Sequence, residues 1–132
     1  MQILWGRAVL SGLLTEAILM IVFAIYLAIG MPAAVVTATV IVGSFALPLW
    51  FATTLGRRLQ NRFVLHGLLI GGAAFAIYMA MYAIGRVFQP NAGPQPVAYW
   101  IAHALKFIGG AAGATIASRR RLSDRSGATA AL

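Results

Sequence analysis

The sequence predicts an all-α fold, a four-helix transmembrane bundle. The chain has 132 residues, of which 61% are hydrophobic and only 9% are charged, with a mean hydropathy of +0.89. A soluble domain carries about 25% charged residues, so the charged residues here are too few to cover a water-exposed surface. Four apolar stretches follow one another, each with about 20 or more residues, enough to cross roughly 30 Å of hydrocarbon.

Turn signals divide the chain into four spans, predicted over about 8–30, 33–55, 63–88 and 97–118. Gly30-Met31-Pro32 separates the first two spans, because proline fits the first position of a helix. Pro48 lies inside the second span and predicts a kink there. The turn-rich stretch 89–96 separates the third span from the fourth. Residues 1–118 are therefore one transmembrane domain, and residues 119–132 are a basic cytoplasmic tail that we expect to be disordered.

The arginines predict the orientation of the bundle. An even number of spans places both termini on one side of the membrane, and most basic residues share that side: Arg7, Arg57, Arg58, Arg62, Arg119, Arg120, Arg121 and Arg125. Arg86 lies at the opposite side. We expect the protein to lie in a bacterial inner membrane. By the positive-inside rule, both termini should then be in the cytoplasm. The clustered arginines are expected to contact anionic lipid headgroups, at about 1 kcal/mol for each basic residue.

The first two spans form one predicted helical hairpin and the last two form another, and the two hairpins share a weak internal repeat. Gly12-Leu13-Leu14 recurs as Gly67-Leu68-Leu69, and Ala28-Ile29-Gly30 recurs as Ala83-Ile84-Gly85. These matches favour two parallel-related hairpins, arranged about an axis along the membrane normal. Chance similarity between apolar segments is the alternative explanation.

Two charged residues fall inside the predicted spans, Glu16 in the first and Lys106 in the fourth. A charge at this depth is costly and is usually paired or turned towards the interior of a bundle. Glu16 follows Arg7 by nine residues and Lys106 precedes Arg119 by thirteen, which places them roughly 14 and 20 Å from the same membrane face. The two side chains can span this difference of about 6 Å. We therefore predict an ion pair that joins the first span to the fourth.

Small and polar residues share one face of the third and fourth spans. In the fourth span this face combines Tyr99, Ala102, His103, Lys106, Gly109, Gly110, Gly113 and Ala117. In the third span a similar stripe contains Gly67, Gly71, Ala74, Tyr78 and Tyr82. Small residues at four-residue spacing let neighbouring helices approach closely. We expect these two spans to pack through the glycines, with Lys106 and His103 pointing into the bundle.

Three functions are compatible with this pattern. In the first, Glu16 and Lys106 neutralise each other and fix the order of the helices in a small membrane protein of unassigned activity. In the second, the protein is a proton- or ion-coupled small-molecule transporter or channel that uses Glu16, Lys106 and His103, with Tyr99 extending the polar path. In the third, it is an accessory subunit of a larger membrane complex. A homo-oligomer is compatible with each of them.

Several functions are disfavoured by composition. The chain has no cysteine, and its two histidines and two acidic residues fit no metal-binding or protease spacing. We therefore expect no enzyme activity, no catalytic residue, no metal and no cofactor. The net charge of +8 comes from residues at the ends of the spans, where topology explains it, so we expect no nucleic-acid partner.

Two known families share parts of this pattern. Glu16, a single acidic residue in the first of four helices, resembles the small multidrug resistance transporters, which implies a transport site at that residue. Lys106 and the one-sided arginines depart from the pattern of that family. The two hairpins that end in basic residues resemble the GtrA-like family, which is linked to polyprenyl-carried sugars. That family's Asn-Arg-x-aromatic-x-Phe ending is replaced here by Leu-Gly-Arg-Arg-Leu at 55–59 and by Ser-Arg-Arg-Arg-Leu at 118–122.

Overall fold

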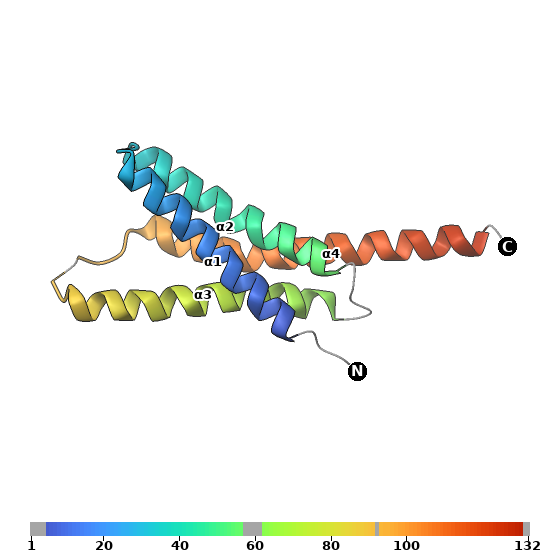
Figure 1. Cartoon of the computed structure of the whole chain (residues 1–132). Helices are drawn as coiled ribbons and strands as arrows, with labels where there is room; N and C mark the ends of the chain where they lie inside the picture. The colour runs from blue at the N-terminus through green and yellow to red at the C-terminus, as the bar shows by residue number, and fades with distance from the viewer. Residues whose placement is uncertain (1–4, 57–61, 92, 131–132) are drawn as a thin grey trace.

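Four α-helices and the short connections between them make up the described part of the chain. The computed structural model describes residues 5–56, 62–91 and 93–130, with side chains up to residue 123. The helices are α1 (Trp5–Ala28), α2 (Ala33–Gly56), α3 (Phe63–Phe88) and α4 (Val97–Ala130). They run in alternating directions, so both termini lie at one end of the bundle (Figure 1). We call this the terminal end, and the end with the turns at 29–32 and 89–96 the hairpin end. The prediction of an all-helical chain with four helices is confirmed.

Three of the helices have the length and apolar character of membrane spans. α1, α2 and α3 contain 24, 24 and 26 residues and are apolar enough to cross a membrane. Their outer faces expose large apolar side chains, such as Ile21, Val42 and Ile84, and exposure of such residues is favourable in lipid. These helices indicate an integral membrane protein. α4 does not reach the same apolar level along its described length, because it contains a lysine, a histidine and three glycines and then continues into the basic segment that begins at Arg119.

Glycines bring the helices together in the half of the bundle nearest the terminal end. Gly67 of α3 and Gly110 of α4 meet backbone to backbone. A Cβ on Gly71 would lie 2.8 Å from the carbonyl oxygen of Lys106, and a Cβ on Gly12 would lie 2.7 Å from that of Ile70. Contacts as short as these leave no room for a side chain. This half of the bundle is therefore closed by direct contact between helix backbones.

The glycines of α4 serve two neighbours rather than one. Gly109 faces the Phe45 carbonyl and Gly113 faces the Leu49 carbonyl, both on α2, whereas Gly110 faces α3. The expectation that Gly109 and Gly113 pack against the third span therefore differs from the structure. Consecutive residues of a helix point about 100° apart, so Gly109 and Gly110 cannot both face the same neighbour. α4 packs against both α2 and α3, with Gly109 in contact with α2 and Gly110 in contact with α3.

The helices separate towards the hairpin end. The buried residues of α1 lie between Ala8 and Leu19, and those of α3 lie between His66 and Ala74, so neither helix has a buried residue in the last third of its length, at the hairpin end. A Cβ on Gly85, near the end of α3, would meet nothing within 4 Å. Figure 1 shows α1 crossing α3 and diverging from it beyond the crossing. The bundle is thus tightly packed at one end and open at the other.

The structure differs from the sequence prediction at the end of the fourth helix and agrees with it at the turn around Gly30. α4 continues as a helix to Ala130, whereas the sequence predicted a disordered tail from residue 119. Extending an existing helix avoids the cost of nucleation, and arginine and leucine favour a helix. At the hairpin end, Gly30 has a φ of 69° in the turn between α1 and α2, a backbone conformation that glycine adopts without strain.

Candidate functional site

An ion pair between Glu16 and Lys106 lies at the centre of the bundle. The Lys106 Nζ is 2.5 Å from the Glu16 Oε2, and the two residues are 2% and 4% exposed. Among the residues that the structure describes, no Cα atom of α1 lies within 8 Å of one in α4. The two long side chains therefore span a distance that the helix backbones do not close. The pair predicted from residue depth is present, and it links the first and fourth helices.

The lysine is held from a second direction by an aromatic ring. The Lys106 Nζ lies 5.5 Å from the centre of the Tyr78 ring, within the range of a cation–π contact. On the terminal side of the pair, Gly71 packs against the backbone of Lys106. Next to Glu16, the Thr15 hydroxyl donates a 2.9 Å hydrogen bond to the Ser11 carbonyl within α1. The ion pair thus rests on the closed half of the bundle and faces the open half.

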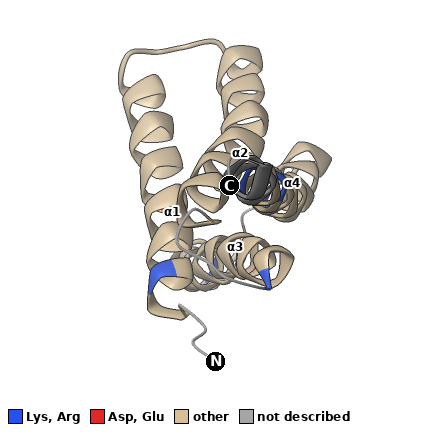
Figure 2. Cartoon of the chain, turned by 90° about the vertical axis from the view of Figure 1, so that its right-hand side faces the viewer, with Lys and Arg blue, Asp and Glu red and all other residues tan. Residues whose placement is uncertain are grey.

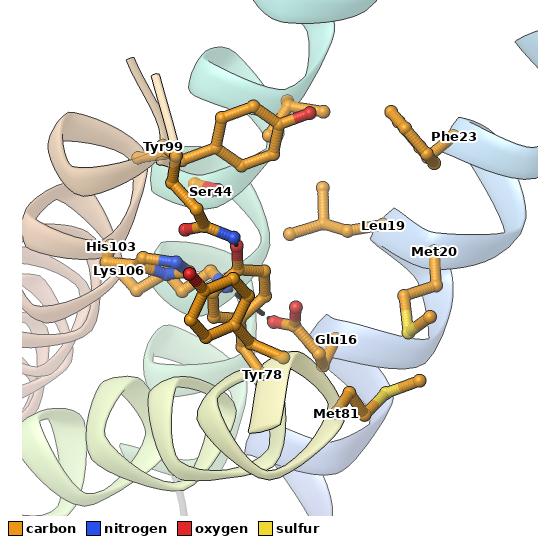
Figure 3. Close-up of a pocket in the computed structure, with 14 residues that line it drawn as sticks. Glu16, Leu19, Met20, Phe23, Ser44, Tyr78, Met81, Tyr99, His103 and Lys106 are labelled. Atoms are coloured by element: carbon orange, nitrogen blue, oxygen red, sulfur yellow. Dashed lines mark hydrogen bonds and ion pairs between the residues drawn. The ribbon is translucent and has the colours of Figure 1, made fainter. Parts of the chain in front are cut away.

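A cavity of about 290 Å³ lies on the hairpin side of the ion pair (Figure 3). All four helices line it, and Gln95 from the 89–96 connection completes the wall. Glu16 and Lys106 form its floor. Its apolar wall is formed by aromatic, methionine and aliphatic side chains: Leu19, Met20, Phe23, Val40, Tyr78, Met81, Tyr82, Tyr99 and Ala102. A space of this size is near the lower limit of small-molecule pockets, which begin at about 300 Å³.

Two buried polar side chains in the cavity wall have no hydrogen-bond partner in the described part of the protein. Both ring nitrogens of His103 and the hydroxyl oxygen of Ser44 are unpaired, although the residues are only 5% and 0% exposed. Buried polar atoms are normally paired, and each exception needs an explanation. The backbone carbonyl of Ser44 also lacks its usual helical hydrogen bond, because Pro48, four residues later, has no N–H to donate.

Aromatic rings fix the orientation of His103. Its ring centre lies 4.0 Å from that of Tyr78 and 5.3 Å from that of Phe75, the second in an edge-on arrangement. Trp100 contacts it on the side of its own helix, at 6.2 Å. The imidazole is thus held by packing while its nitrogens stay free to bond. Such an arrangement is suited to receiving a polar group from a ligand.

The connection between α3 and α4 contributes Gln95 to the cavity wall. The Gln95 side-chain amide donates a hydrogen bond to the Tyr78 hydroxyl, and the Tyr78 and Tyr82 rings stack at 6.4 Å and 5°. The remaining amide oxygen of Gln95 is buried without a partner among the described residues. Tyr78 therefore contacts Lys106 at the floor of the cavity, the aromatic side chains of its wall and Gln95 of the connection.

The chain matches no protein-family model, no curated protein and no solved structure.

All four residues that the sequence singled out line this one cavity: Glu16, Tyr99, His103 and Lys106. Four further polar residues of the site were not predicted as site residues. Tyr78 and Tyr82 were noticed only as part of a stripe, and Gln95 only as part of a connection. Ser44 was noticed only as a residue near the kink that Pro48 predicts.

The predicted headgroup-binding arginines lie at the terminal end where the structure describes them. Arg62 precedes α3 and is exposed, as are Arg119 and Arg120 on α4, whereas Arg121 is partly buried. Arg57 and Arg58 lie outside the described residues. Figure 2 looks onto this end and shows basic segments at the starts of α1 and α3. No group of three potential metal ligands occurs in the part of the chain that is described.

Proposed function

We propose that the chain is a four-span membrane protein with both termini in the cytoplasm, and that it transports a small molecule through the cavity above the Glu16–Lys106 pair. One observation carries the proposal. The cavity has unpaired polar atoms in its wall and a buried ion pair at its floor, and it stops where the glycine packing begins. A site that is open on one side and closed on the other is what alternating access requires.

The burial pattern of α4 supports a fourth span. His103 and Lys106 face the interior, whereas Trp100, Ile101 and Ile108 on the outer face are 48%, 49% and 55% exposed. A polar group hidden in the bundle costs far less in a membrane than one facing lipid. His103 and Lys106 lower the mean hydropathy of α4, but they face the interior and do not contact lipid. The mean value therefore underestimates how well the outer face of α4 suits a membrane.

The charge distribution supports an orientation with both termini in the cytoplasm of a bacterial inner membrane. Arg7 of α1, Arg62 just before α3 and residues 119–121 of α4 place their basic side chains at the terminal end, whereas Arg86 of α3 lies towards the hairpin end. Basic residues in short segments remain preferentially on the cytoplasmic side. In this orientation the cavity lies in the outer half of the membrane, and the arginines face anionic headgroups.

The ion pair offers a route to proton coupling. A proton on Glu16 would remove the charge that attracts Lys106, and α1 would then lose the link that the pair makes to α4. The glycine contacts are shallow backbone contacts, along which helices can shift relative to one another. Protonation would thus favour opening of the closed half, and release of the proton would restore the packed state.

Cysteine accessibility tests this function directly, because the natural chain has no cysteine. Ala102 and Ala114 both belong to α4 and are each 1% exposed. Ala102 lines the cavity, whereas Ala114 lies in the closed half of the bundle. In intact cells, a small membrane-impermeant methanethiosulfonate should modify Ala102→Cys and spare Ala114→Cys. In inverted vesicles, Ala114→Cys should become reactive as the pH falls, and should lose this pH dependence when Glu16→Gln is added.

Two surface variants serve as orientation controls in the same experiment. Gln89→Cys should react from outside the cell, and Leu122→Cys should react only in inverted vesicles. The opposite labelling would contradict the orientation. If Ala114→Cys stays unreactive at every pH while Ala102→Cys reacts, the cavity is a static pocket and the transport proposal is wrong.

A further inference from the structure

The cavity wall combines uncharged hydrogen-bonding groups with aromatic rings, and this composition points to a substrate class. We propose that the substrate is a small uncharged aromatic molecule of one or two rings that carries a hydroxyl or an N–H group. This inference rests on the proposed function, since it describes what the transport site binds.

The state of the charges argues against an ionic ligand. The Glu16 carboxylate is already bonded to the Lys106 ammonium at 2.5 Å, and that ammonium also lies over the Tyr78 ring. The two charges cancel, so the cavity has no net charge to offer. A charged ligand would either separate the pair or add an uncompensated charge to a buried site, and both are unfavourable.

The unpaired polar atoms define what the ligand must supply. Neither ring nitrogen of His103 has a hydrogen-bond partner among the described residues, and in the neutral ring one of them is a donor and the other an acceptor. The Ser44 hydroxyl can both donate and accept. A single hydroxyl or N–H group on the ligand can pair with such atoms, and pairing a buried polar atom that is otherwise unsatisfied is a favourable exchange.

The rest of the wall favours an aromatic ring. Phe23, Tyr78 and Tyr99 line the cavity with aromatic rings, and Met20 and Met81 also line it (Figure 3). Rings pack well against rings and against polarizable thioethers. The cavity volume of about 290 Å³ limits the ligand to one or two fused rings.

Met20 and Met81 mark the route by which such a ligand would enter. They are 41% and 42% exposed, the highest exposures among the large apolar residues of the wall, and they come from α1 and α3. These are the two helices that diverge towards the hairpin end (Figure 1). An uncharged aromatic molecule partitions into a bilayer and can enter between the two helices.

Protection of a cavity cysteine tests the substrate class. In the full chain carrying Ala102→Cys, phenol and indole should slow modification by the methanethiosulfonate reagent. Toluene has the size of phenol without its hydroxyl, and it should need about tenfold higher concentration, the cost of about one hydrogen bond. Benzoate and benzyltrimethylammonium should give no protection.

Substitutions within the site should reproduce that difference. His103→Phe keeps the ring that packs against Tyr78 and removes both nitrogens, and Ser44→Ala removes the hydroxyl. Each should weaken protection by phenol by about tenfold and leave protection by toluene unchanged. Ser118→Ala is the matched control, because its hydroxyl bonds to the Thr115 carbonyl away from the cavity, and it should change neither.

Each outcome has a distinct meaning. Protection by benzoate or benzyltrimethylammonium as strong as that by phenol would overturn the uncharged class. Equal protection by toluene and phenol would overturn the role of His103 and Ser44. If Ala102→Cys reacts but none of the compounds protects it, the substrate class is wrong and the proposed transport function stands. If Ala102→Cys never reacts from either side, the transport function fails as well.

Discussion

Separating the two charges of the central pair should destabilise the protein, and the cost should depend on pH in opposite ways for the two partners. The test is a double-mutant cycle of Glu16→Gln, Lys106→Met and the two together. Both side chains are buried and in contact, so each single substitution leaves one buried charge without its partner. Breaking a buried pair in this way costs about 3 to 5 kcal/mol, whereas replacing both partners is often neutral or stabilising.

The remaining charged group sets an upper limit on each cost, because it can be neutralised instead of remaining charged. Glu16→Gln leaves a lysine, whose deprotonation at pH 7 from an ordinary pKa of about 10.4 costs about 4.6 kcal/mol. Lys106→Met leaves a glutamate, whose protonation at pH 7 from an ordinary pKa of about 4.3 costs about 3.7 kcal/mol. Lowering the pH to 5.5 should reduce the second limit to about 1.6 kcal/mol, and raising it to 8.5 should reduce the first to about 2.6 kcal/mol.

Unfolding in mixed detergent micelles measures these free energies. The mole fraction of dodecyl sulfate is raised at pH 5.5, 7 and 8.5, and helix content is followed by far-ultraviolet circular dichroism. We expect both single variants to be destabilised at pH 7, with the Lys106→Met variant recovering at low pH and the Glu16→Gln variant at high pH. The double variant should stay within about 1 kcal/mol of the natural chain, or exceed it. Single effects that simply add in the double variant would show that the pair does not hold α1 to α4.

Two further predictions concern packing and orientation. Gly67→Ala should cost about 1 to 3 kcal/mol in the same unfolding assay, because its Cβ would overlap the Gly110 backbone. Gly85→Ala should be close to neutral, because its Cβ would meet none of the described atoms within 4 Å. Equal effects of the two substitutions would contradict the close helix packing at the terminal end. Replacing Arg119, Arg120 and Arg121 together by glutamine should raise the fraction of inverted molecules, measured as labelling of Leu122→Cys in intact cells, and an unchanged fraction would show that other arginines set the orientation.

The sequence predicted the ion pair because a helix has a fixed rise. Once Arg7 and Arg119 are taken to mark the same membrane face, the depths of Glu16 and Lys106 follow from counting residues. No knowledge of which helices touch was needed. This also explains why the prediction succeeded although α1 and α4 have no close backbone contact in the described part of the chain.

The cavity could not be predicted in the same way, because it depends on how the helices cross. The contact of Gly12 with the Ile70 backbone fixes where α1 meets α3, and their divergence beyond that point creates the space above the pair. A stripe of small residues shows that close approach is possible, without showing which neighbour approaches. For the same reason the sequence did not show that Gly109 faces α2 and Gly110 faces α3.

The ion pair lies where the closed half of the bundle meets the open half, and its properties depend on both. If glycine packing extended along the full length of the helices, Glu16 and Lys106 would meet in a solid core and would have no route to protons or ligands. If the open half extended past them, the pair would be hydrated and would contribute little to holding α1 against α4. Its position at the boundary makes it both a structural link and the floor of the cavity. A variant that replaces both charges should therefore keep the fold, and even strengthen it, while it loses the pH-dependent opening that we propose at Ala114.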